Sequence, residues 1–262
     1  MRIIAVGTLK GGTGKTTTVF NMAGCLAEKN NVLLIDCDPQ ANLSQDCGID
    51  ITNQDVDSIK SVFDNYVEPS KTIIKSPIKE LPNLDLLASN IWLTETEMLL
   101  VNRSSRERIL YNYIDDNKEV FEKYDYIICD TNPSMSIINQ NAFFIADSII
   151  LMTDISKNGL TGVELFDYLW SKSSKDLRKE NNIKALILNN SDSRTLLSKE
   201  LMEYCCEDED LNKILIDMII PQAVKIKETS IEHKPINVYK PKSKEHDIYD
   251  QLINKLEERG IL

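Results

Sequence analysis

The feature that most constrains the fold is a glycine-rich loop between an apolar strand and an apolar helix. Residues 3–6 are continuously apolar, and they lead into the run Gly7-Thr8-Leu9-Lys10-Gly11-Gly12-Thr13-Gly14-Lys15-Thr16-Thr17. Apolar residues then recur at helical spacing between Val19 and Leu26. In this order of elements, the backbone N–H groups of the loop and the positive end of the helix dipole point at one anion. The sequence therefore predicts a phosphate-binding loop within an α/β fold.

Two side chains of this loop have the chemistry to hold a nucleoside triphosphate. Lys15 is placed to neutralise the β- and γ-phosphates, and the hydroxyl of Thr16 lies where a phosphate-bound Mg²⁺ needs a ligand. Leu9 stands where the standard pattern G-x-x-x-x-G-K-[ST] has its first glycine, so the loop is a variant of that pattern. The alternative is a glycine-rich turn before an ordinary helix, which the order of strand, loop and helix disfavours.

Short apolar runs recur along the chain and predict a doubly wound, mostly parallel sheet with helices on both faces. Continuous runs of Ile, Val and Leu are typical of parallel strands that are covered on both sides. They occupy residues 3–6, 32–35, 126–129, 148–152 and 185–188. Apolar residues at helical spacing recur between residues 137 and 145. We expect the 262 residues to form a single domain, 1–262, in which residues 68–82 are a surface excursion.

Carboxylates follow two of the predicted strands at their carboxyl ends, the edge where open parallel sheets bind ligands. Asp36 and Asp38 come after residues 32–35, and Asp130 comes after residues 126–129. A single aspartate at a strand end is often only a turn or a helix cap. Beside a phosphate-binding loop, however, such an aspartate is able to hold Mg²⁺, directly or through water. A carboxylate near the γ-phosphate is able to orient the attacking water.

Composition narrows the classes of protein that fit. Hydrophobic residues at 42% and charged residues at 27% are typical of a globular protein and exclude a fibrous or disordered one. A formal net charge of −11 disfavours general adhesion to nucleic acid or anionic membranes, so such contacts need a local basic patch. With no membrane-spanning run and no signal peptide, we expect a cytoplasmic protein. The six cysteines form no CxxC pair and are expected to be reduced, and two histidines exclude a multi-histidine metal site.

Several of these segments together resemble the deviant-Walker ATPases of the ParA/MinD family, and within it the ParA-type DNA partition ATPases. The resemblance extends over nearly the whole chain. It is carried by residues 10–17, Asp36-Cys37-Asp38-Pro39-Gln40, residues 124–131, and Ile220-Pro221 with Lys234-Pro235. It implies the fold of P-loop NTPases, with ATP and Mg²⁺ as cofactors.

The resemblance implies a role for each matching residue. Lys10 matches the family's signature lysine, which reaches across a face-to-face homodimer to the partner's ATP and offsets the charge of two buried nucleotides. Asp38 matches the residue that positions the hydrolytic water. The expected catalytic residues are Lys10, Lys15 and Asp38, and the expected metal ligands are Thr16, Asp36 and Asp130. Asn190 and Pro221 match a region that contacts adenine, so the expected nucleotide-binding residues are Lys10, Gly11, Gly12, Thr13, Gly14, Lys15, Thr16, Thr17, Asn190 and Pro221.

Two segments depart from the family pattern. Where the family commonly has Asp-x-Pro-Pro, this chain has Asp130-Thr131-Asn132-Pro133, so this loop is expected to move differently. Where partition ATPases often have Pro-Arg-Asn-Val-Arg, this chain has Pro221-Gln222-Ala223-Val224-Lys225 and lacks both arginines. Residues 221–244 still contain six lysines against two glutamates. The candidate contacts to DNA phosphates are Arg194, Lys199, Lys225 and Lys227.

The resemblance implies that ATP drives formation of a sandwich dimer, that the dimer binds DNA without sequence preference, and that hydrolysis releases it. Because the loop supplies no arginine finger, turnover is expected to be slow and to be stimulated by a ParB-like centromere-binding protein. The cargo would be a plasmid or a chromosome origin, and the ATP-bound protein would associate with the nucleoid.

Three alternatives remain open. One is a MinD-like membrane-positioning ATPase. The apolar residues Ile248, Leu252, Ile253 and Leu256 form an amphipathic pattern, but its mixed polar face favours packing against the domain over membrane binding. The second is a metabolic enzyme that shares the loop, such as an ATP-dependent ligase or the iron–sulfur reductase of nitrogenase. The third is a regulatory module that binds nucleotide with little turnover.

Overall fold

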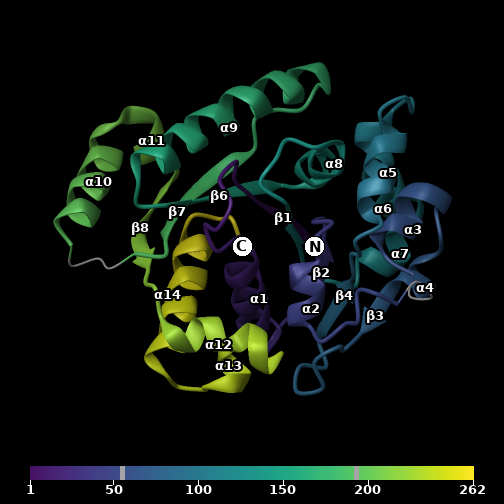
Figure 1. Ribbon diagram of the computed structural model, residues 1–262, viewed down its shortest axis with the longest axis horizontal. Helices are drawn as coiled ribbons and strands as arrows, with labels where there is room; N and C mark the ends of the chain where they lie inside the picture. Colours follow the sequence, from purple (N-terminus) through teal and green to yellow (C-terminus); the bar gives the residue numbers. More distant parts are fainter. Residues whose placement is uncertain (54–56, 192–194) are drawn as a thin grey trace.

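The computed structural model describes residues 1–53, 57–191 and 195–262, in which the strands form an eight-stranded sheet (Figure 1). The strand order is β3-β4-β2-β5-β1-β6-β7-β8. All neighbours are parallel except β3 and β4, which pair antiparallel. The strands are β1 (Arg2–Gly7), β2 (Val32–Asp36), β3 (Ile73–Lys75), β4 (Leu84–Leu87), β5 (Tyr126–Asp130), β6 (Ser148–Asp154), β7 (Ile183–Asn189) and β8 (Leu215–Ile220).

Helices cover both faces of the sheet and give the fold three layers (Figure 1). One layer contains α3, α5, α6, α8 and α9, and the other contains α1, α2, α12, α13 and α14. The helices are α1 (Lys15–Leu26), α2 (Asn42–Asp46), α3 (Ile59–Asn65), α4 (Pro69–Thr72), α5 (Leu93–Leu100), the 3₁₀ turn η1 (Arg106–Arg108), α6 (Ile109–Asp116), α7 (Lys118–Phe121), α8 (Ile137–Ile145), α9 (Lys157–Asp176), α10 (Leu196–Glu207), α11 (Glu209–Ile214), α12 (Val224–Glu232), α13 (Ile236–Tyr239) and α14 (Lys244–Glu258).

The alternation of side chains along each strand divides the hydrophobic core into two halves. On β1, Ile3 and Ala5 face the layer that holds α8 and α9, where Trp170 is fully buried. Ile4 and Val6 face the opposite layer, with α1 and α14. Because both faces of the central strands are covered, these strands contain the continuous apolar runs that the sequence shows.

The central position of β1 brings the ends of several strands together. β1 lies between β5 and β6, with Val6 opposite Asp130 and Gly7 opposite Leu151. Asp36 of β2 is in turn opposite Asp130 of β5. Strands that follow β1 in the chain lie on both sides of it, so the connections diverge at this point. Open α/β sheets bind ligands at such a switch point, at the carboxyl ends of the strands.

The predicted doubly wound, mostly parallel sheet with helices on both faces is confirmed, and each predicted strand is present. The strands β3, β4 and β8 were not predicted. The interpretation of residues 68–82 as a surface excursion is wrong for the part that forms α4 and β3, because Ile73 is buried and β3 extends the sheet at its edge.

The amphipathic C-terminal segment packs on the domain, as its mixed polar face predicts. It forms α14, which lies against α1, and its apolar face buries Leu252 and Leu256 completely. The six cysteines all carry free thiols, and five of them are buried. Within the described residues, no helix combines the length and the apolar character needed to cross a bilayer.

Candidate functional site

The glycine-rich loop connects β1 to α1 in a conformation that glycine permits. Gly12 has φ 77° and Gly14 has φ 80°, both in the left-handed region. A Cβ built on Gly11 or Gly12 would meet no atom within 4 Å, so this side of the loop is open to a ligand. A Cβ on Gly14 would lie 2.2 Å from the Asn189 amide nitrogen, and glycine is therefore required there.

Lys15, the first residue of α1, is buried beside carboxylates. Its side chain is surrounded by protein, and this burial lowers the pKa of the ammonium group, while Asp130 and Asp38 oppose the change. A cation held at a helix start next to open glycines is suited to bind phosphate oxygens.

Asp130 and its neighbours form the acidic part of the site. Thr16 Oγ1 donates a hydrogen bond of 2.6 Å to Asp130 Oδ2. The other oxygen, Oδ1, is buried and accepts no hydrogen bond from the described residues. Burial raises the pKa of Asp130 to about 6, and burial together with the nearby Asp130 raises the pKa of Asp36 to about 8. The buried carboxylates of Asp36 and Asp130, together with the Thr16 hydroxyl, offer the oxygen ligands that a hard divalent cation such as Mg²⁺ prefers.

The segment after β2 is ordered by Asp36. Its Oδ2 accepts hydrogen bonds from the backbone N–H of Ser44 at 2.9 Å and from the Ser44 hydroxyl at 2.7 Å, and its Oδ1 accepts from the N–H of Asp38. Asp38 is 7% exposed, and its Oδ1 accepts from the N–H of Gln40. The second oxygen of Asp38 accepts no hydrogen bond from a described residue, so it is able to accept one from a water.

Lys10 contacts its own chain. Its Nζ lies 2.5 Å from Asp154 Oδ2 and 3.0 Å from Ser156 Oγ. Burial raises the pKa of Asp154, but hydrogen bonds from Lys10 and Ser156 outweigh it and bring the pKa below its usual value. Asp154 ends β6 and Ser156 caps α9, so these residues hold the lysine at the carboxyl edge of the sheet.

Sequence reasoning missed three of these residues: Asp154, Ser156 and Asn189. Asn189 ends β7 and donates a hydrogen bond of 2.6 Å to the carbonyl oxygen of Thr13 in the loop. The available signal was the polar residue at the end of each of two apolar strands, the same signal that identified Asp36 and Asp130.

The two predicted adenine contacts, Asn190 and Pro221, lie close to each other, directly after β7 and β8. Asn190 is exposed, has φ 61°, and donates its backbone N–H to the carbonyl of Ile220 at 2.9 Å, next to Pro221. Of the remaining loop residues, Thr13 is buried and Thr17 is half-buried. The structure therefore gathers the phosphate and metal residues closely and places the adenine candidates at the ends of β7 and β8.

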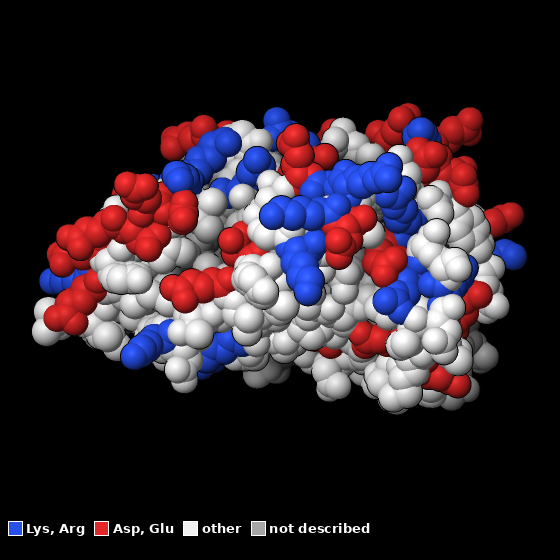
Figure 2. All heavy atoms as spheres, turned by 90° about the horizontal axis from the view of Figure 1, so that it is seen from above, with Lys and Arg blue, Asp and Glu red and all other residues white. Residues whose placement is uncertain are grey.

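The candidate DNA contacts are surface residues of different character. Lys225 forms an ion pair of 3.0 Å with Glu245, whereas Lys227 and Lys199 are exposed. Arg194 lies outside the described residues. Lys225 and Lys227 belong to α12, in the layer opposite α8 and α9. Figure 2 looks onto the layer with α8 and α9 and shows acidic and basic side chains interspersed.

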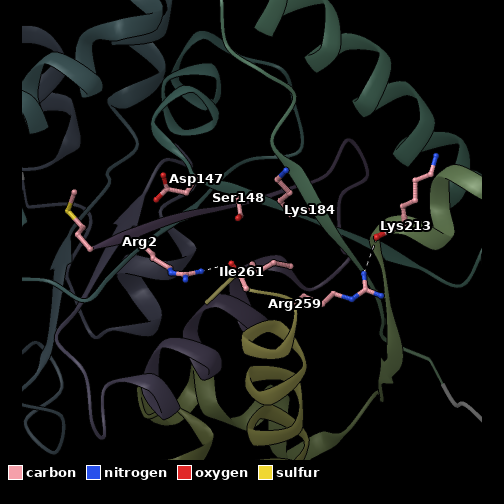
Figure 3. A pocket seen from close by; sticks show the side chains of 9 residues that line it. Arg2, Asp147, Ser148, Lys184, Lys213, Arg259 and Ile261 are labelled. Carbon is pink, nitrogen blue, oxygen red and sulfur yellow. Dashed lines mark hydrogen bonds between the residues drawn. The ribbon is translucent and has the colours of Figure 1, made fainter.

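A separate cavity of about 770 Å³ lies at the amino ends of the strands, on the side of the sheet opposite to the carboxyl ends (Figure 3). It is lined by Arg2, Lys184 and Arg259. Arg2 donates to the carbonyl of Gly260, and Arg259 donates to the carbonyl of Lys213 at 3.2 Å. Since the strands are parallel, this cavity and the glycine-rich loop are at opposite ends of β1. The cavity is therefore no part of the phosphate site.

Comparison with known proteins identifies the family. A family model described as an AAA domain matches residues 1–184. The chain is 31% identical over 264 residues to the sporulation initiation inhibitor protein Soj of Bacillus subtilis, with 99% of each chain covered. The chain belongs to the ParA/MinD family of P-loop ATPases. Within this family it is also 29% identical to the chromosome partitioning protein ParA of Myxococcus xanthus, over 98% of this chain and 88% of the relative.

A solved structure has the same fold. A plasmid partition protein of Borrelia burgdorferi, bound to AMPPNP, superposes with a TM-score of 0.80 at 22% identity and covers 98% of this chain and 99% of that chain. The ParA/MinD fold accordingly places the P-loop of this chain at the switch point of the sheet.

Proposed function

We propose that this ParA/MinD-family chain is a dimerising partition ATPase that uses ATP and Mg²⁺, binds DNA without sequence preference in its ATP state, and acts with a ParB-like partner in plasmid or chromosome segregation. The observation that carries the proposal is the gathering of Lys15, Thr16 and Asp130 at the P-loop. Here one buried oxygen of Asp130 accepts no hydrogen bond from any described residue. The similarity to Soj and to a ParA over nearly the full chain supports the partition role.

Each residue of the site has a defined task in this proposal. The open backbone at Gly11 and Gly12 receives phosphate oxygens, and Lys15 neutralises the β- and γ-phosphates. Thr16, Asp130 and Asp36 hold the metal, whose chemistry is to offset the charge that develops on the transferred phosphoryl group. Asp38, with one carboxylate oxygen available, orients the water that attacks the γ-phosphorus.

Dimerisation depends on Lys10 in this proposal. In the single chain Lys10 contacts Asp154 and Ser156 at the edge of the sheet next to the P-loop. When two protomers meet face to face, Lys10 of each leaves these contacts for the nucleotide bound by the other. ATP then stabilises the dimer because the additional γ-phosphate gives each lysine a partner of high negative charge.

DNA binding would follow from the dimer, which doubles every basic surface. Lys199 and Lys227 are exposed and available to phosphates, and Lys225 becomes available when its ion pair with Glu245 exchanges. Hydrolysis separates the protomers and releases DNA. No arginine lies in the P-loop, so turnover is slow until a ParB-like protein stimulates it.

The test of dimerisation is light scattering of the hydrolysis-blocked variant Asp38→Ala with ATP and Mg²⁺. We expect the mass of a dimer, and we expect Lys10→Ala in the same background to remain a monomer. Lys29→Ala removes an exposed lysine from the turn that follows α1 and is the matched control, with no effect on mass. Normal dimers of the Lys10→Ala variant would refute the role of Lys10 in the partner's site.

The test of DNA binding compares two duplexes of unrelated sequence at several salt concentrations. We expect equal affinity for both, binding only with ATP, and a logarithmic salt slope that falls by about 0.9 for each phosphate contact removed by Lys199→Ala or Lys227→Ala. Phosphate release by the wild type and by Asp38→Ala, with and without DNA, separates an ATPase from a module that only binds nucleotide.

A further inference from the structure

A cluster of side chains of the types that bind metal ions lies between α1 and α14, far from the P-loop. Cys25 lies in the last turn of α1, and His246 and Asp250 are four residues apart on α14, so they share one face of that helix. The sulfur of Cys25, a ring nitrogen of His246 and a carboxylate oxygen of Asp250 lie within 4.8 Å of one another. In residues 1–53, 57–191 and 195–262 no other trio of His, Cys, Asp or Glu side chains meets this condition.

The surroundings of the cluster favour a metal ligand at His246. Its side chain is 12% exposed, and its Nε2 is buried without a hydrogen-bond partner among the described residues. Asp250 Oδ1 lies 3.6 Å from this nitrogen, beyond hydrogen-bond distance. Buried polar nitrogens are rarely left without a partner, because the loss of hydration is then uncompensated.

We propose that Cys25, His246 and Asp250 bind a Zn²⁺ ion, with a water molecule in the fourth position. Thiolate, imidazole and carboxylate are the ligand types that zinc takes in proteins, at bond lengths that place neighbouring ligands of a tetrahedral ion about 3.5 Å apart. The ligand atoms lie within 4.8 Å of one another, so side-chain rotations that move each atom by roughly an ångström complete the site. The Cys25 thiol loses its proton on binding, and its sulfur then donates an electron pair to the metal.

One hydrogen bond has to change when the metal binds. The backbone N–H of Lys242 donates to His246 Nδ1 at 3.2 Å, so the neutral ring carries its proton on Nε2. Coordination through Nε2 moves this proton to Nδ1 and breaks the bond from Lys242. Lys242 is exposed, so water replaces the lost acceptor, and one such exchange is small against three metal–ligand bonds.

The two metal sites of the chain would differ in chemistry and in consequence. The P-loop site offers oxygen ligands, which Mg²⁺ prefers, whereas sulfur and imidazole select zinc. Cys25 lies ten residues beyond Lys15 on α1, about 15 Å along the helix, so zinc does not touch the nucleotide. Its effect is to fasten α14 to the helix that carries the P-loop lysine, independently of ATP.

The test is metal binding by the untagged, reduced, full-length chain. We use Co²⁺ as a probe, because a cobalt–thiolate bond gives a charge-transfer absorption that oxygen and nitrogen ligands do not. We expect one Co²⁺ per chain with this absorption, its displacement by one equivalent of Zn²⁺ but not by excess Mg²⁺, and a higher midpoint of thermal unfolding with Zn²⁺.

Variants assign the ligands. Cys25→Ser is expected to abolish the charge-transfer absorption, and His246→Gln and Asp250→Asn are each expected to weaken Zn²⁺ binding at least about tenfold. Cys206→Ser, which changes an exposed thiol on α10, is the matched control and leaves binding unchanged. Circular dichroism verifies folding. If Cys25→Ser does not fold, the two α14 variants decide the question.

Two results would overturn the proposal: a folded wild-type chain that binds no Co²⁺, or a thiolate absorption that survives in Cys25→Ser. Undiminished zinc affinity in both α14 variants would do the same. None of these readouts depends on ATP, so the outcome is independent of the proposed partition activity.

Discussion

Replacing Asp154 with asparagine is expected to tighten the proposed ATP-dependent dimer. Lys10 Nζ lies 2.5 Å from Asp154 Oδ2 and donates to Ser156 as well. A lysine that is held by its own protomer does not reach a nucleotide in the other, so the contact with Asp154 must break when the dimer forms. The substitution Asp154→Asn keeps the shape of the side chain and removes its charge.

The size of the effect follows from the exposure of the pair. The side chains of Lys10 and Asp154 are 32% and 29% exposed, so solvent screens their attraction and the ion pair is worth about 1 kcal/mol. Formation of the dimer breaks two such pairs, which costs about 2 kcal/mol in total. Asp154→Asn removes this cost, so the dissociation constant of the dimer is expected to fall about 30-fold.

Sedimentation of the Asp38→Ala background with ATP and Mg²⁺ measures this constant. Glu164→Gln, an exposed residue of α9 with the same change of charge, is the control and leaves the constant unchanged. The double variant Lys10→Ala, Asp154→Asn is expected to gain nothing, since no lysine is left to release. If Asp154→Asn weakened the dimer instead, Asp154 would be shown to position Lys10 for the partner's site, and this reasoning would be refuted.

Three further predictions follow from other contacts. Burial raises the pKa of Asp46 to about 6 against the opposing effects of Ser230 and His233. The folded chain therefore holds this proton more tightly than the unfolded chain, and the free energy of unfolding falls by about 3 kcal/mol as the pH rises from about 3 to about 7. Asp46→Asn should flatten this part of a urea-denaturation series, and an unchanged profile would contradict the assignment. Asn189→Ala loses the hydrogen bond to the P-loop carbonyl and should weaken nucleotide binding about fivefold in calorimetry, at a cost of about 1 kcal/mol. Leu252→Ala, at a fully buried position of α14, should lower the free energy of unfolding by about 2–5 kcal/mol, while an exposed substitution such as Glu257→Ala should not.

Local patterns made most of the sheet predictable, and polar residues within strands account for the strands that were missed. The five predicted strands are apolar runs that contain no charged residue. In β8, which reads L-I-D-M-I-I, Asp217 is exposed and interrupts the run. In β4, which reads L-D-L-L, Asp85 is almost fully buried but is paired with Lys75 at 2.7 Å and accepts a hydrogen bond from Tyr124. A carboxylate that is satisfied by distant partners cannot be distinguished, in sequence, from one in a loop.

The clustering of the candidate phosphate and metal residues was predictable because the P-loop is a contiguous motif and because Asp36 and Asp130 end apolar strands. The contacts of Lys10 with Asp154 and of Asn189 with the loop were not. They join positions more than a hundred residues apart, and they depend on β6 and β7 following β1 in the sheet order. The hydrophobic period identifies a strand but carries no information on its neighbours, so strand order had to come from the structure.

The residues that would respond to nucleotide are joined by direct contacts to the helix that carries candidate DNA lysines. Asp36, a proposed metal ligand, accepts two hydrogen bonds from Ser44 in the middle of α2. The carbonyl of the next residue, Gln45, contacts the ring of His233 at 2.8 Å, directly after α12. Because adjacent residues of this short helix make the two contacts, we expect a displacement at Asp36 to reach the end of α12. We therefore expect the position of α12 to respond to the state of the P-loop, as the proposed ATP-dependent DNA binding requires.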